Sequence, residues 1–582
     1  MQAASHRTEV RLVGTASSAG VARGPAYVLF RGMALVPCVE NQDPEAEIHR
    51  LESAISATRA DIIKVRDEVA LRLNEAEAQI FDAQLLVLED VALLDDVVSR
   101  TRATRRNIEH CFKESAQHYV GLFESMESEI IRGRAADIRD VTGRVLDHLV
   151  GAQPERGDQV GGGRVLVARD LTPSDTVSAE SGGITAFVTE EGGRTSHSAI
   201  MARALGIPSV VGVTGLMAAV NDGDLVLVDG EDGLVIVNPT APTLESYRAR
   251  ELIIRTRRDR VMSEVAFEDV MSDGSRFELR ANIGGPSDME DLKAFHVRGV
   301  GLYRTENLYL RIDDWPSEDE QYGEYTEVIR RASGDPVTFR TLDLGGDKRL
   351  GVLEPEDNPF MGFRAVRLCL AHPEVFRPQL RAIIRAAVHG PVSIMFPMIS
   401  GVEEMLAAKA AFREAEASLA AEGVRPAAPV RLGAMIEIPS AVAVADRLAR
   451  ECDFFSVGTN DLVQYMLAVD RGNRKVGSLY DPCHPAVVQS LRAIFRAAES
   501  ARIPASVCGE LGGDPEWAPL LLALGASELS MSASAIPEVR FLLRHCQRPE
   551  LDALATRVLA ASDAAQTRTL LREFASKRLG HR

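Results

Sequence analysis

The sequence predicts an α/β protein of several domains: an α/β domain with an inserted helical bundle, a helical linker, and a C-terminal (β/α)₈ barrel of the TIM type. Three observations support this fold class. The chain has 582 residues, too many for a single hydrophobic core. Helical periodicity of apolar residues runs through most of residues 43–148. From residue 269 onward, eight β-rich segments alternate with helical ones, which is the pattern of a strand-and-helix barrel.

Composition and charge indicate a globular protein and argue against several kinds of binding partner. Hydrophobic residues make up 46% of the chain and charged residues 26%, which is ordinary for a globular protein. The formal net charge of −18 disfavours binding to nucleic acid or to an anionic membrane surface, and it suits a basic protein partner. Seven scattered cysteines without CxxC or Cys/His spacing favour a reducing compartment and argue against structural zinc.

The sequence carries no membrane or export signal that we can identify. No apolar run approaches the ~20 residues that a membrane helix needs, and residues 1–10 lack the apolar region of a signal peptide. We therefore expect a cytoplasmic protein without membrane insertion.

Two separate stretches are needed to build the first α/β domain. Residues 9–30 alternate short apolar runs with Gly and Ser, which predicts two strands joined by a turn. Strand-like segments return further along, in GRVLVARD, ITAFVTEE, PSVVGV and DLVLVDG. We assign residues 1–42 and 149–240 to one domain, which the helical residues 43–148 interrupt.

The inserted segment has a clear helical start. Asp43 can cap the N-terminus of a helix, and Pro44 suits its first position. Apolar residues then recur at helical spacing, at Ile48, Leu51, Ile55, Ile62, Val65 and Val69. Residues 241–268 lack Gly and Pro after Pro242, so we expect a helical linker between the two halves of the chain.

The barrel and its C-terminal helices are assigned to residues 269–582. TIM barrels build their active sites from the C-terminal ends of the strands. Polar residues stand at five of the predicted ends, and two more arginines follow in loops: Arg304, Arg340 and Asp343, Glu437, Asn460 and Asp461, Cys508 and Glu510, then Arg364 and Arg471. We expect these side chains to converge at one mouth of the barrel.

Several arginines beside two carboxylates suit a small, multiply charged anion together with a divalent metal. Arginine binds phosphate and carboxylate oxygens in pairs, and carboxylates hold Mg²⁺. Spacing alone leaves other interpretations open: each arginine could pair with a surface acid, and Glu437 and Asp461 could form a salt bridge at the barrel mouth. Cys508 could equally be a small buried apolar residue.

A glycine loop that leads into a helix lies at residues 192–208. Ser196 is a good N-cap, and Gly206 and Pro208 end the helix. His197 then falls in the first turn, where free backbone N–H groups and the helix dipole favour an anionic group. This place suits a histidine that carries a phosphoryl group; the alternative is a polar N-terminal residue that merely faces solvent.

The motifs of both halves resemble one known family. GGRTSHSAIMARALGIPSVVG resembles the phosphohistidine signature of the phosphoenolpyruvate-utilising enzymes. In the barrel, GVGLYRTENLYL, RTLDLGGDK, MFPMIS, FFSVGTNDLVQYMLAVDRGN and CGELGGD resemble, in order and spacing, enzyme I of the bacterial phosphoenolpyruvate:sugar phosphotransferase system. The similarity extends from about Val10 to Leu570.

The resemblance implies a role for each matching residue. His197 would accept the phosphoryl group of phosphoenolpyruvate, and Cys508 would protonate the enolate to give pyruvate. Glu437 and Asp461 would bind Mg²⁺. Phosphoenolpyruvate would be held by Arg304, Arg340, Asn460, Asp461 and Arg471, with Thr172 orienting the phosphohistidine ring and Arg364 in support.

The resemblance also implies partners. The phosphoryl group would pass to a histidine of the small carrier protein HPr, the first general step of sugar uptake. The helical domain would dock this carrier near residues 81–90, and the α/β domain would swing on the linker. A homodimer through the barrel is implied as well.

Three departures from the family pattern stand out. Gln84 occupies a position where well-known members have a histidine, which bears on carrier specificity. Asn307 stands where an aromatic residue is usual, and the stretch at 481–487 is atypical.

Three alternatives compete with enzyme I. Dikinases and phosphoenolpyruvate synthases need a large nucleotide-binding domain, for which the chain has no room. The nitrogen-linked paralogue normally has a preceding sensory domain, whereas the first family strand begins here near Val10. A non-catalytic regulatory relative would not be expected to retain the complete set of site residues.

Overall fold

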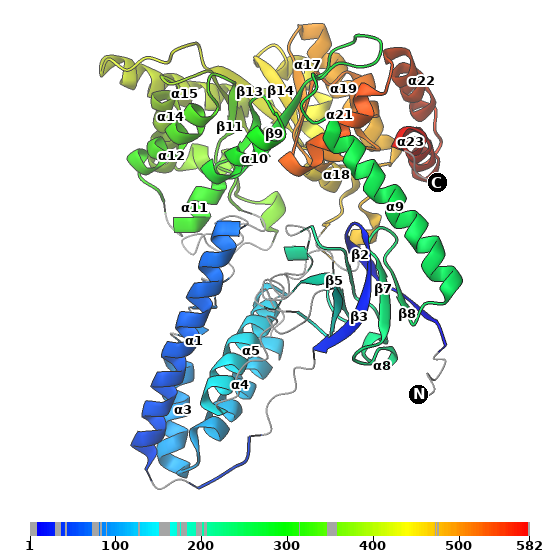
Figure 1. The fold of residues 1–582 in the computed structure, drawn as a ribbon. Coiled ribbons are helices and arrows are strands. Elements are labelled where there is room, and N and C mark those ends of the chain that lie inside the picture. Colours follow the sequence, from blue (N-terminus) through cyan, green and yellow to red (C-terminus); the bar gives the residue numbers. More distant parts are fainter. Residues whose placement is uncertain are drawn as a thin grey trace. The chain divides into compact units, whose positions relative to one another are not determined.

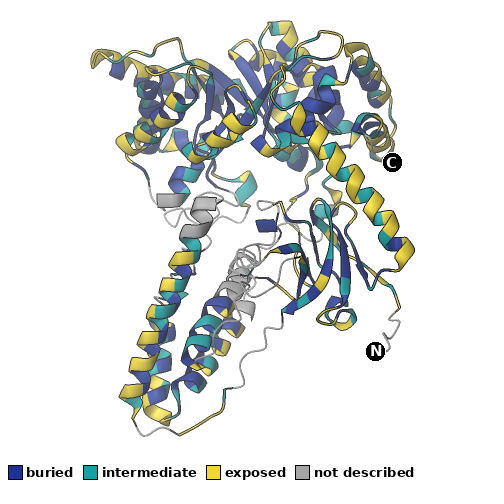
Figure 2. Cartoon of the chain, viewed as in Figure 1, coloured by how far each residue is buried: buried dark blue, intermediate teal, exposed yellow. Residues whose placement is uncertain are grey.

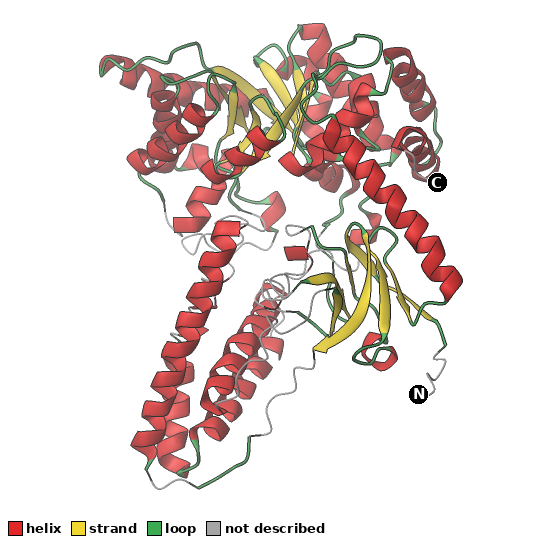
Figure 3. Ribbon diagram, in the orientation of Figure 1, coloured by secondary structure: helices red, strands yellow, loops and turns green. Residues whose placement is uncertain are grey.

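The structure is a computed structural model. It describes residues 8–29, 36–40, 43–72, 81, 84, 85, 87, 88, 90–125, 129–150, 163–171, 175, 183–193, 199, 201, 202, 206–312, 315–345, 358–471, 473 and 476–579. Contacts divide the chain into two compact units, Met1–Thr256 and Arg257–Arg582. The predicted α/β fold with a helical insertion and a closed barrel is confirmed (Figures 1 and 3). The four domain boundaries drawn from the sequence remain a prediction.

The first unit contains an eight-stranded mixed sheet. Its strands are β1 (Val10–Val13), β2 (Thr15–Ser18), β3 (Val21–Leu29), β4 (Arg164–Ala168), β5 (Ile184–Thr189), β6 (Ser209–Val211), β7 (Leu225–Asp229) and β8 (Leu234–Val237), in the order β1-β8-β7-β3-β4-β5-β6-β2. A short helix, α8 (Leu216–Ala219), precedes β7.

The N-terminal residues complete this sheet as predicted, but with three strands rather than two. Gly14 separates two strands that pair at opposite edges of the sheet: β1 pairs with β8 at one edge, and β2 pairs with β6 at the other. A Cβ atom at position 14 would lie 2.8 Å from the carbonyl oxygen of Val211, so only glycine fits this crossing.

In its described ranges, the helical insertion between β3 and β4 includes α1 (Pro44–Arg72), α3 (Val91–Thr104), α4 (Ile108–Ser125) and α5 (Glu129–Val150). These helices pack on a shared core that includes Leu51, Ile62, Phe81 and Phe112. Their prediction from apolar periodicity is confirmed. Among the helices of the described ranges, none is both long and apolar enough to cross a membrane.

Helix α9 (Ala241–Ser263) follows the sheet, and its two ends have different anchors. In the first unit, Arg250 pairs with Asp229 at 3.1 Å and Asp232 at 2.7 Å. In the second unit, Arg257 pairs with Glu538. Between these anchors the helix is largely exposed, as Figure 2 shows. The predicted helical linker is therefore a single helix that ends at Ser263, before the predicted boundary at residue 268.

The second unit is built around a closed barrel of eight parallel strands. They are β9 (Leu279–Ile283), β10 (Val300–Arg304), β11 (Val337–Arg340), β12 (Val392–Phe396), β13 (Arg431–Ile436), β14 (Phe454–Val457), β15 (Ala505–Val507) and β16 (Glu528–Met531), and β16 pairs with β9 to close the ring. Each of the eight β-rich segments found in the sequence forms one of these strands. The barrel prediction is therefore confirmed.

Helices surround the barrel strands (Figure 3). In chain order they are α10 (Met289–Ala294), α11 (Glu306–Ile312), α12 (Glu318–Arg331), α13 (Val366–Ala371), α14 (Pro373–Ala386), α15 (Val402–Ala421), α16 (Pro439–Ala443), α17 (Ala445–Leu448), α18 (Thr459–Leu467), α19 (Pro485–Ala501), α20 (Ala518–Leu524), α21 (Ile536–Arg544), α22 (Arg548–Leu559) and α23 (Ala564–Leu579). One large apolar core fills the space between strands and helices.

Candidate active site

A cavity of about 180 Å³ opens at the C-terminal ends of the barrel strands. All the site residues predicted for the barrel line it: Arg304, Arg340, Arg364, Glu437, Asn460, Asp461, Arg471 and Cys508. Arg304 and Arg340 end β10 and β11, while Glu437 and Cys508 directly follow β13 and β15. Parallel strands bring these positions to one edge, which is why residues far apart in the chain meet here. We call this space the barrel cavity.

The guanidinium group of Arg340 is held between two buried carboxylates. Its Nη2 lies 2.5 Å from Oε1 of Glu306, and its Nη1 lies 2.9 Å from Oδ2 of Asp343. Burial disfavours the charged form of Arg340, but the two carboxylates outweigh burial and raise its pKa. The side chain therefore stays charged and fixed in direction. Its buried Nε has no hydrogen-bond partner within the described part of the chain, which leaves a donor for another acceptor.

Asp343 also holds the second buried arginine. Arg364 Nη2 lies 2.8 Å from Oδ1 of Asp343 and 3.7 Å from Oδ2 of Asp461. Burial opposes the charge of Arg364, but these carboxylates raise its pKa overall. Asp343 thus connects two arginines of the barrel cavity, although the sequence singled it out only as a polar residue after a strand.

Two acids line the cavity together: Glu437 is buried, and Asp461 is partly buried, with 19% of its side chain exposed. Burial raises the pKa of Glu437, and the negative charges of Asp461 and Asp343 raise it further. Burial also raises the pKa of Asp461, against the opposing charge of Arg364. Glu437 Oε1 accepts a 2.7 Å hydrogen bond from the backbone N–H of Met398. A Cβ atom on Gly458 would lie 2.3 Å from Glu437 Oε2, so this glycine makes room for the carboxylate.

This pair fits a divalent cation. Carboxylates whose ionised forms repel each other in a buried place are stabilised when a cation neutralises both. No group of three or more His, Cys, Asp or Glu side chains with metal-binding geometry occurs in the described ranges. Mg²⁺ commonly takes only one or two protein carboxylates and completes its shell with water and substrate oxygens, so two acids are sufficient.

Asn460 and Arg471 share one partner, Glu510. Asn460 Nδ2 donates to Glu510 Oε1 at 3.0 Å, and Arg471 Nη1 lies 3.2 Å from the same oxygen. The backbone N–H of Glu510 donates in return to Asn460 Oδ1 at 3.0 Å. The Glu510 side chain is 75% exposed, so this contact lies at the rim of the barrel cavity. Arg304 also lines the cavity and is exposed.

Cys508 lies against the buried wall of the cavity. Its side chain is buried, and its Sγ lies 3.5 Å from the carbonyl oxygen of Val457. Burial raises the pKa of the Cys508 thiol to about 11, with Glu437 adding to the shift. The sulfur therefore carries its proton at neutral pH. A protonated thiol is a poor nucleophile, and its proton is available to a strong base such as a carbanion.

Two predicted residues, His197 and Thr172, lie outside the described residues. Ala199, Met201 and Ala202, which follow His197, are described as helical, in agreement with the predicted helix. Met201 is fully buried and joins the core of the helical insertion.

The structure also places the three departures from the family pattern. Gln84 is fully buried, and its Nε2 donates to Oδ2 of Asp140 at 3.1 Å, so its side chain has no surface for a carrier. Asn307 packs against Gly284, where a Cβ atom would lie 2.0 Å from Asn307 Nδ2. In the 481–487 stretch, Asp481 pairs with Arg568 at 2.7 Å.

Glu306 is a site residue that sequence reasoning missed. It directly follows Thr305 in the RTE motif and is fully buried against Arg340. Its position just past the end of a strand and close to a candidate arginine was the available signal.

The fold and the barrel cavity together define a barrel enzyme that acts on a small, multiply charged anion. Comparison with known families agrees with this class. The chain matches three models of the PEP-utilising enzymes: the N-terminal domain over residues 13–134, the mobile domain over residues 160–233 and the PEP-binding domain over residues 258–548. The last of these contains the barrel cavity.

Three relatives match almost from end to end, and each is a phosphoenolpyruvate-protein phosphotransferase. The protein of Listeria monocytogenes is 42% identical over 97% of this chain and 99% of its own length. That of Geobacillus stearothermophilus is 42% identical over 96% and 97%, and that of Bacillus subtilis is 40% identical over 97% and 99%. The chain therefore belongs to the phosphoenolpyruvate-protein phosphotransferase family, the enzymes I of the phosphotransferase system, and is a transferase.

Proposed function

We propose that this chain transfers the phosphoryl group of phosphoenolpyruvate to its own His197 and then to a histidine of an HPr-type carrier protein, releasing pyruvate. The observation that carries the proposal is the barrel cavity, in which two buried, charge-fixed arginines lie with the buried Glu437 and the partly buried Asp461. Its charge pattern suits phosphoenolpyruvate, which combines a phosphate with a carboxylate.

Binding uses the residues of the barrel cavity. Arg304, Arg340 and Arg471 neutralise the phosphate and carboxylate, Asn460 contributes a neutral donor, and Arg364 supports the set through Asp343. Glu437 and Asp461 would hold Mg²⁺, which when bound would neutralise charge on the transferring phosphoryl group. Arg340 and Arg364 are held by buried carboxylates and Glu437 by a backbone N–H group, so these three side chains need little rearrangement during the reaction.

The transfer step can be written with balanced bonds. The phosphorus–oxygen bond of phosphoenolpyruvate breaks, a phosphorus–nitrogen bond to the imidazole of His197 forms, and the electron pair remains on the enolate. The Cys508 thiol then gives its proton to the methylene carbon of the enolate, which yields pyruvate. Thr172 orients the imidazole ring, so that one ring nitrogen is free to attack.

The carrier docks on the helical insertion. Asp90 and Asp95 are exposed at the start of α3, and such acidic side chains suit a basic rim on the partner. Because Gln84 is buried, it would act on this surface only through the packing of Asp140 and α5. The α/β domain moves on helix α9 between the barrel and the carrier.

The working form would be a cytoplasmic homodimer through the barrel that feeds sugar uptake. Two large apolar side chains of the second unit support a protein contact on the barrel: Met361 is 67% exposed and Phe363 is 41% exposed. Both lie in the segment just before α13. Both lie between Phe360 and Arg364, which line the barrel cavity, so they favour a protein contact beside the cavity, and the homodimer itself rests on the family resemblance.

The test of this function is transfer of label from [³²P]phosphoenolpyruvate. We expect acid-labile label on the wild-type chain that requires Mg²⁺, is lost with EDTA and passes to added HPr. Absence of label on the wild-type chain would refute the proposal in favour of a regulator without catalytic activity. Light scattering of the same preparation tests the dimer.

A further inference from the structure

A buried glutamine connects the two strand ends that carry substrate-binding arginines. Gln379 lies on α14 and is fully buried. Its Nε2 donates to Oγ1 of Thr305 at 3.2 Å, and its Oε1 accepts from the backbone N–H of Leu342 at 2.9 Å. Thr305 Oγ1 donates in turn to the carbonyl oxygen of Arg340 at 2.9 Å. One side chain of the outer helix layer thus bonds the segments that follow β10 and β11.

These bonds bear on the direction of the arginines because of where they attach. Thr305 is the residue after Arg304, so its hydroxyl is one peptide away from the first arginine. Leu342 precedes Asp343, whose carboxylate holds both Arg340 and Arg364. A displacement of either segment would therefore move the guanidinium groups that line the barrel cavity.

The hydrogen bonds among Gln379, Thr305 and Leu342 are buried, so water cannot take the place of a lost partner. Gln379 and Thr305 are fully buried, and Leu342 is 1% exposed. A buried donor or acceptor that loses its partner has no alternative, so these groups hold each other in one arrangement.

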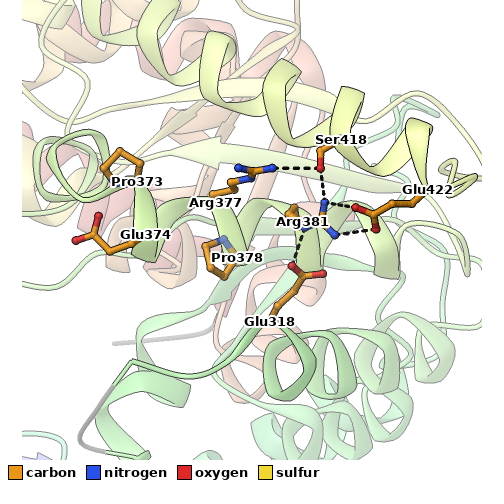
Figure 4. A pocket seen from close by; sticks show the side chains of 8 residues that line it. All are labelled: Glu318, Pro373, Glu374, Arg377, Pro378, Arg381, Ser418 and Glu422. Atoms are coloured by element: carbon orange, nitrogen blue, oxygen red, sulfur yellow. Dashed lines mark hydrogen bonds and ion pairs between the residues drawn. The ribbon is translucent and has the colours of Figure 1, made fainter.

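Helix α14 is itself fixed from the other side. On its outer face, shown in Figure 4, Arg381 reaches Glu318 of α12 at 2.7 Å. The same side chain reaches Glu422 after α15 at 2.9 Å and Ser418 of α15 at 2.6 Å. Arg381 lies close to Gln379 in the sequence, so one short stretch of α14 is anchored outward to its neighbouring helices and inward to the strand ends.

We propose that Gln379 is a positioning residue for phosphoenolpyruvate binding, which sets the spacing of the arginines of β10 and β11 through Thr305 and Leu342. This role rests on the proposed function of the barrel cavity. Gln379 does not line the cavity and touches no reacting atom. Its effect is therefore on how well the arginines match the substrate anion.

The test compares two buried glutamines on neighbouring helices. Gln379→Met keeps the length of the side chain and removes its bonds to Thr305 and Leu342, together with its contact with Tyr325. The matched control is Gln321→Met on α12: Gln321 is also buried and also contacts Tyr325, but its other bonds go to Tyr309 and the carbonyl of Pro316 instead of the ends of β10 and β11. KM and kcat for phosphoenolpyruvate are measured with full-length enzyme and carrier, beside Tm and calorimetric binding of phosphoenolpyruvate.

We expect the two variants to lose similar amounts of thermal stability but to differ in activity. Gln379→Met should raise KM and Kd for phosphoenolpyruvate by about tenfold, because a misdirected arginine loses about one charge-assisted hydrogen bond to the substrate anion. Its kcat should change less than its KM, since the arginines hold substrate before and during transfer. Gln321→Met should leave KM within about twofold of wild type.

Thr305 keeps the proposal testable if Gln379→Met does not fold. Thr305→Val removes the middle hydroxyl and should raise KM similarly, whereas Thr305→Ser should restore it. Equal KM values for wild type, Gln379→Met and Thr305→Val would overturn the proposal, as would a fall in kcat alone. A wild-type enzyme that neither binds nor consumes phosphoenolpyruvate would instead refute the proposed function, so the two failures are distinguishable.

Discussion

The carboxylate of Asp343 should be the most sensitive single group behind the substrate-binding residues. It lies 2.9 Å from Arg340 and 2.8 Å from Arg364, and all three side chains are buried. Asp343→Asn keeps the shape but removes the charge, so each arginine loses part of its fixed partner. Removing one member of a buried ion pair costs about 3–5 kcal/mol.

This magnitude sets the expected kinetic effect. The neutral amide that replaces the carboxylate can still accept one hydrogen bond, so we expect a loss near the lower limit, about 3 kcal/mol. If the transition state is bound more weakly by this amount, kcat/KM for phosphoenolpyruvate falls by about 100-fold, since about 1.36 kcal/mol corresponds to a factor of ten. The assay is pyruvate release coupled to lactate dehydrogenase, with the carrier protein present in excess.

A second ion pair, in which the arginine is buried and the acid is 23% exposed, provides the control. Asp269 pairs with the buried Arg540 at 2.7 Å and does not line the barrel cavity. Asp269→Asn should destabilise the second unit while leaving kcat/KM within about twofold of wild type. If Asp343→Asn kept kcat/KM within about threefold of wild type, the claim that Asp343 orders the two arginines would be wrong.

Three further predictions concern other residues. Because burial raises the pKa of the Cys508 thiol to about 11, its rate of alkylation should still increase above pH 9, which peptide mass spectrometry over a pH series would show. A plateau of that rate near pH 9 would contradict the shift. Glu510→Gln should lower KM for phosphoenolpyruvate by up to about fivefold at low salt, because the exposed Glu510 carboxylate competes with the substrate for Arg471. The Arg471–Glu510 ion pair is worth about 0–1 kcal/mol, which sets this limit. A raised KM in steady-state assays would show that Glu510 does not compete with the substrate. Arg381→Ala should lower the free energy of unfolding, measured in urea, by about 1 kcal/mol, because its partners Glu318 and Glu422 are partly exposed. Its kcat should not change. A large fall in kcat would show that the ion pairs of Arg381 affect the active site.

Much of the fold could be predicted because its signals are local. The eight barrel strands are short apolar segments between helical ones, and the helices of residues 43–150 show regular apolar spacing. The sequence predicts two strands in residues 9–30, because short apolar runs between Gly and Ser do not show that the first run is divided at Gly14. Its crossing depends on contact with Val211, in a distant part of the sequence, and no local pattern reports such a contact.

The sequence predicts which residues line the barrel cavity, but not the hydrogen bonds and ion pairs that hold these residues in place. Strand ends identified Arg304, Arg340, Glu437 and Cys508, because a parallel barrel brings all such ends together. The bonds that fix them join distant segments: Glu306 to Arg340, and Gln379 to Thr305. Gln379 in particular lies in the middle of an amphipathic helix, where a single buried polar residue resembles any other until its partners are known.

Phosphoenolpyruvate binding and phosphoryl acceptance are proposed to lie in different units: the substrate binds in the barrel cavity, and His197 of the other unit accepts its phosphoryl group. Both are measured by calorimetric binding of phosphoenolpyruvate with Mg²⁺, together with mapping of the phosphorylated residue, for wild type, His197→Ala and Arg340→Ala. We expect His197→Ala to bind phosphoenolpyruvate as wild type does but to carry no phosphoryl group, and Arg340→Ala to lose binding. Loss of binding in His197→Ala, or a phosphoryl group on a residue of the barrel, would refute this division of roles.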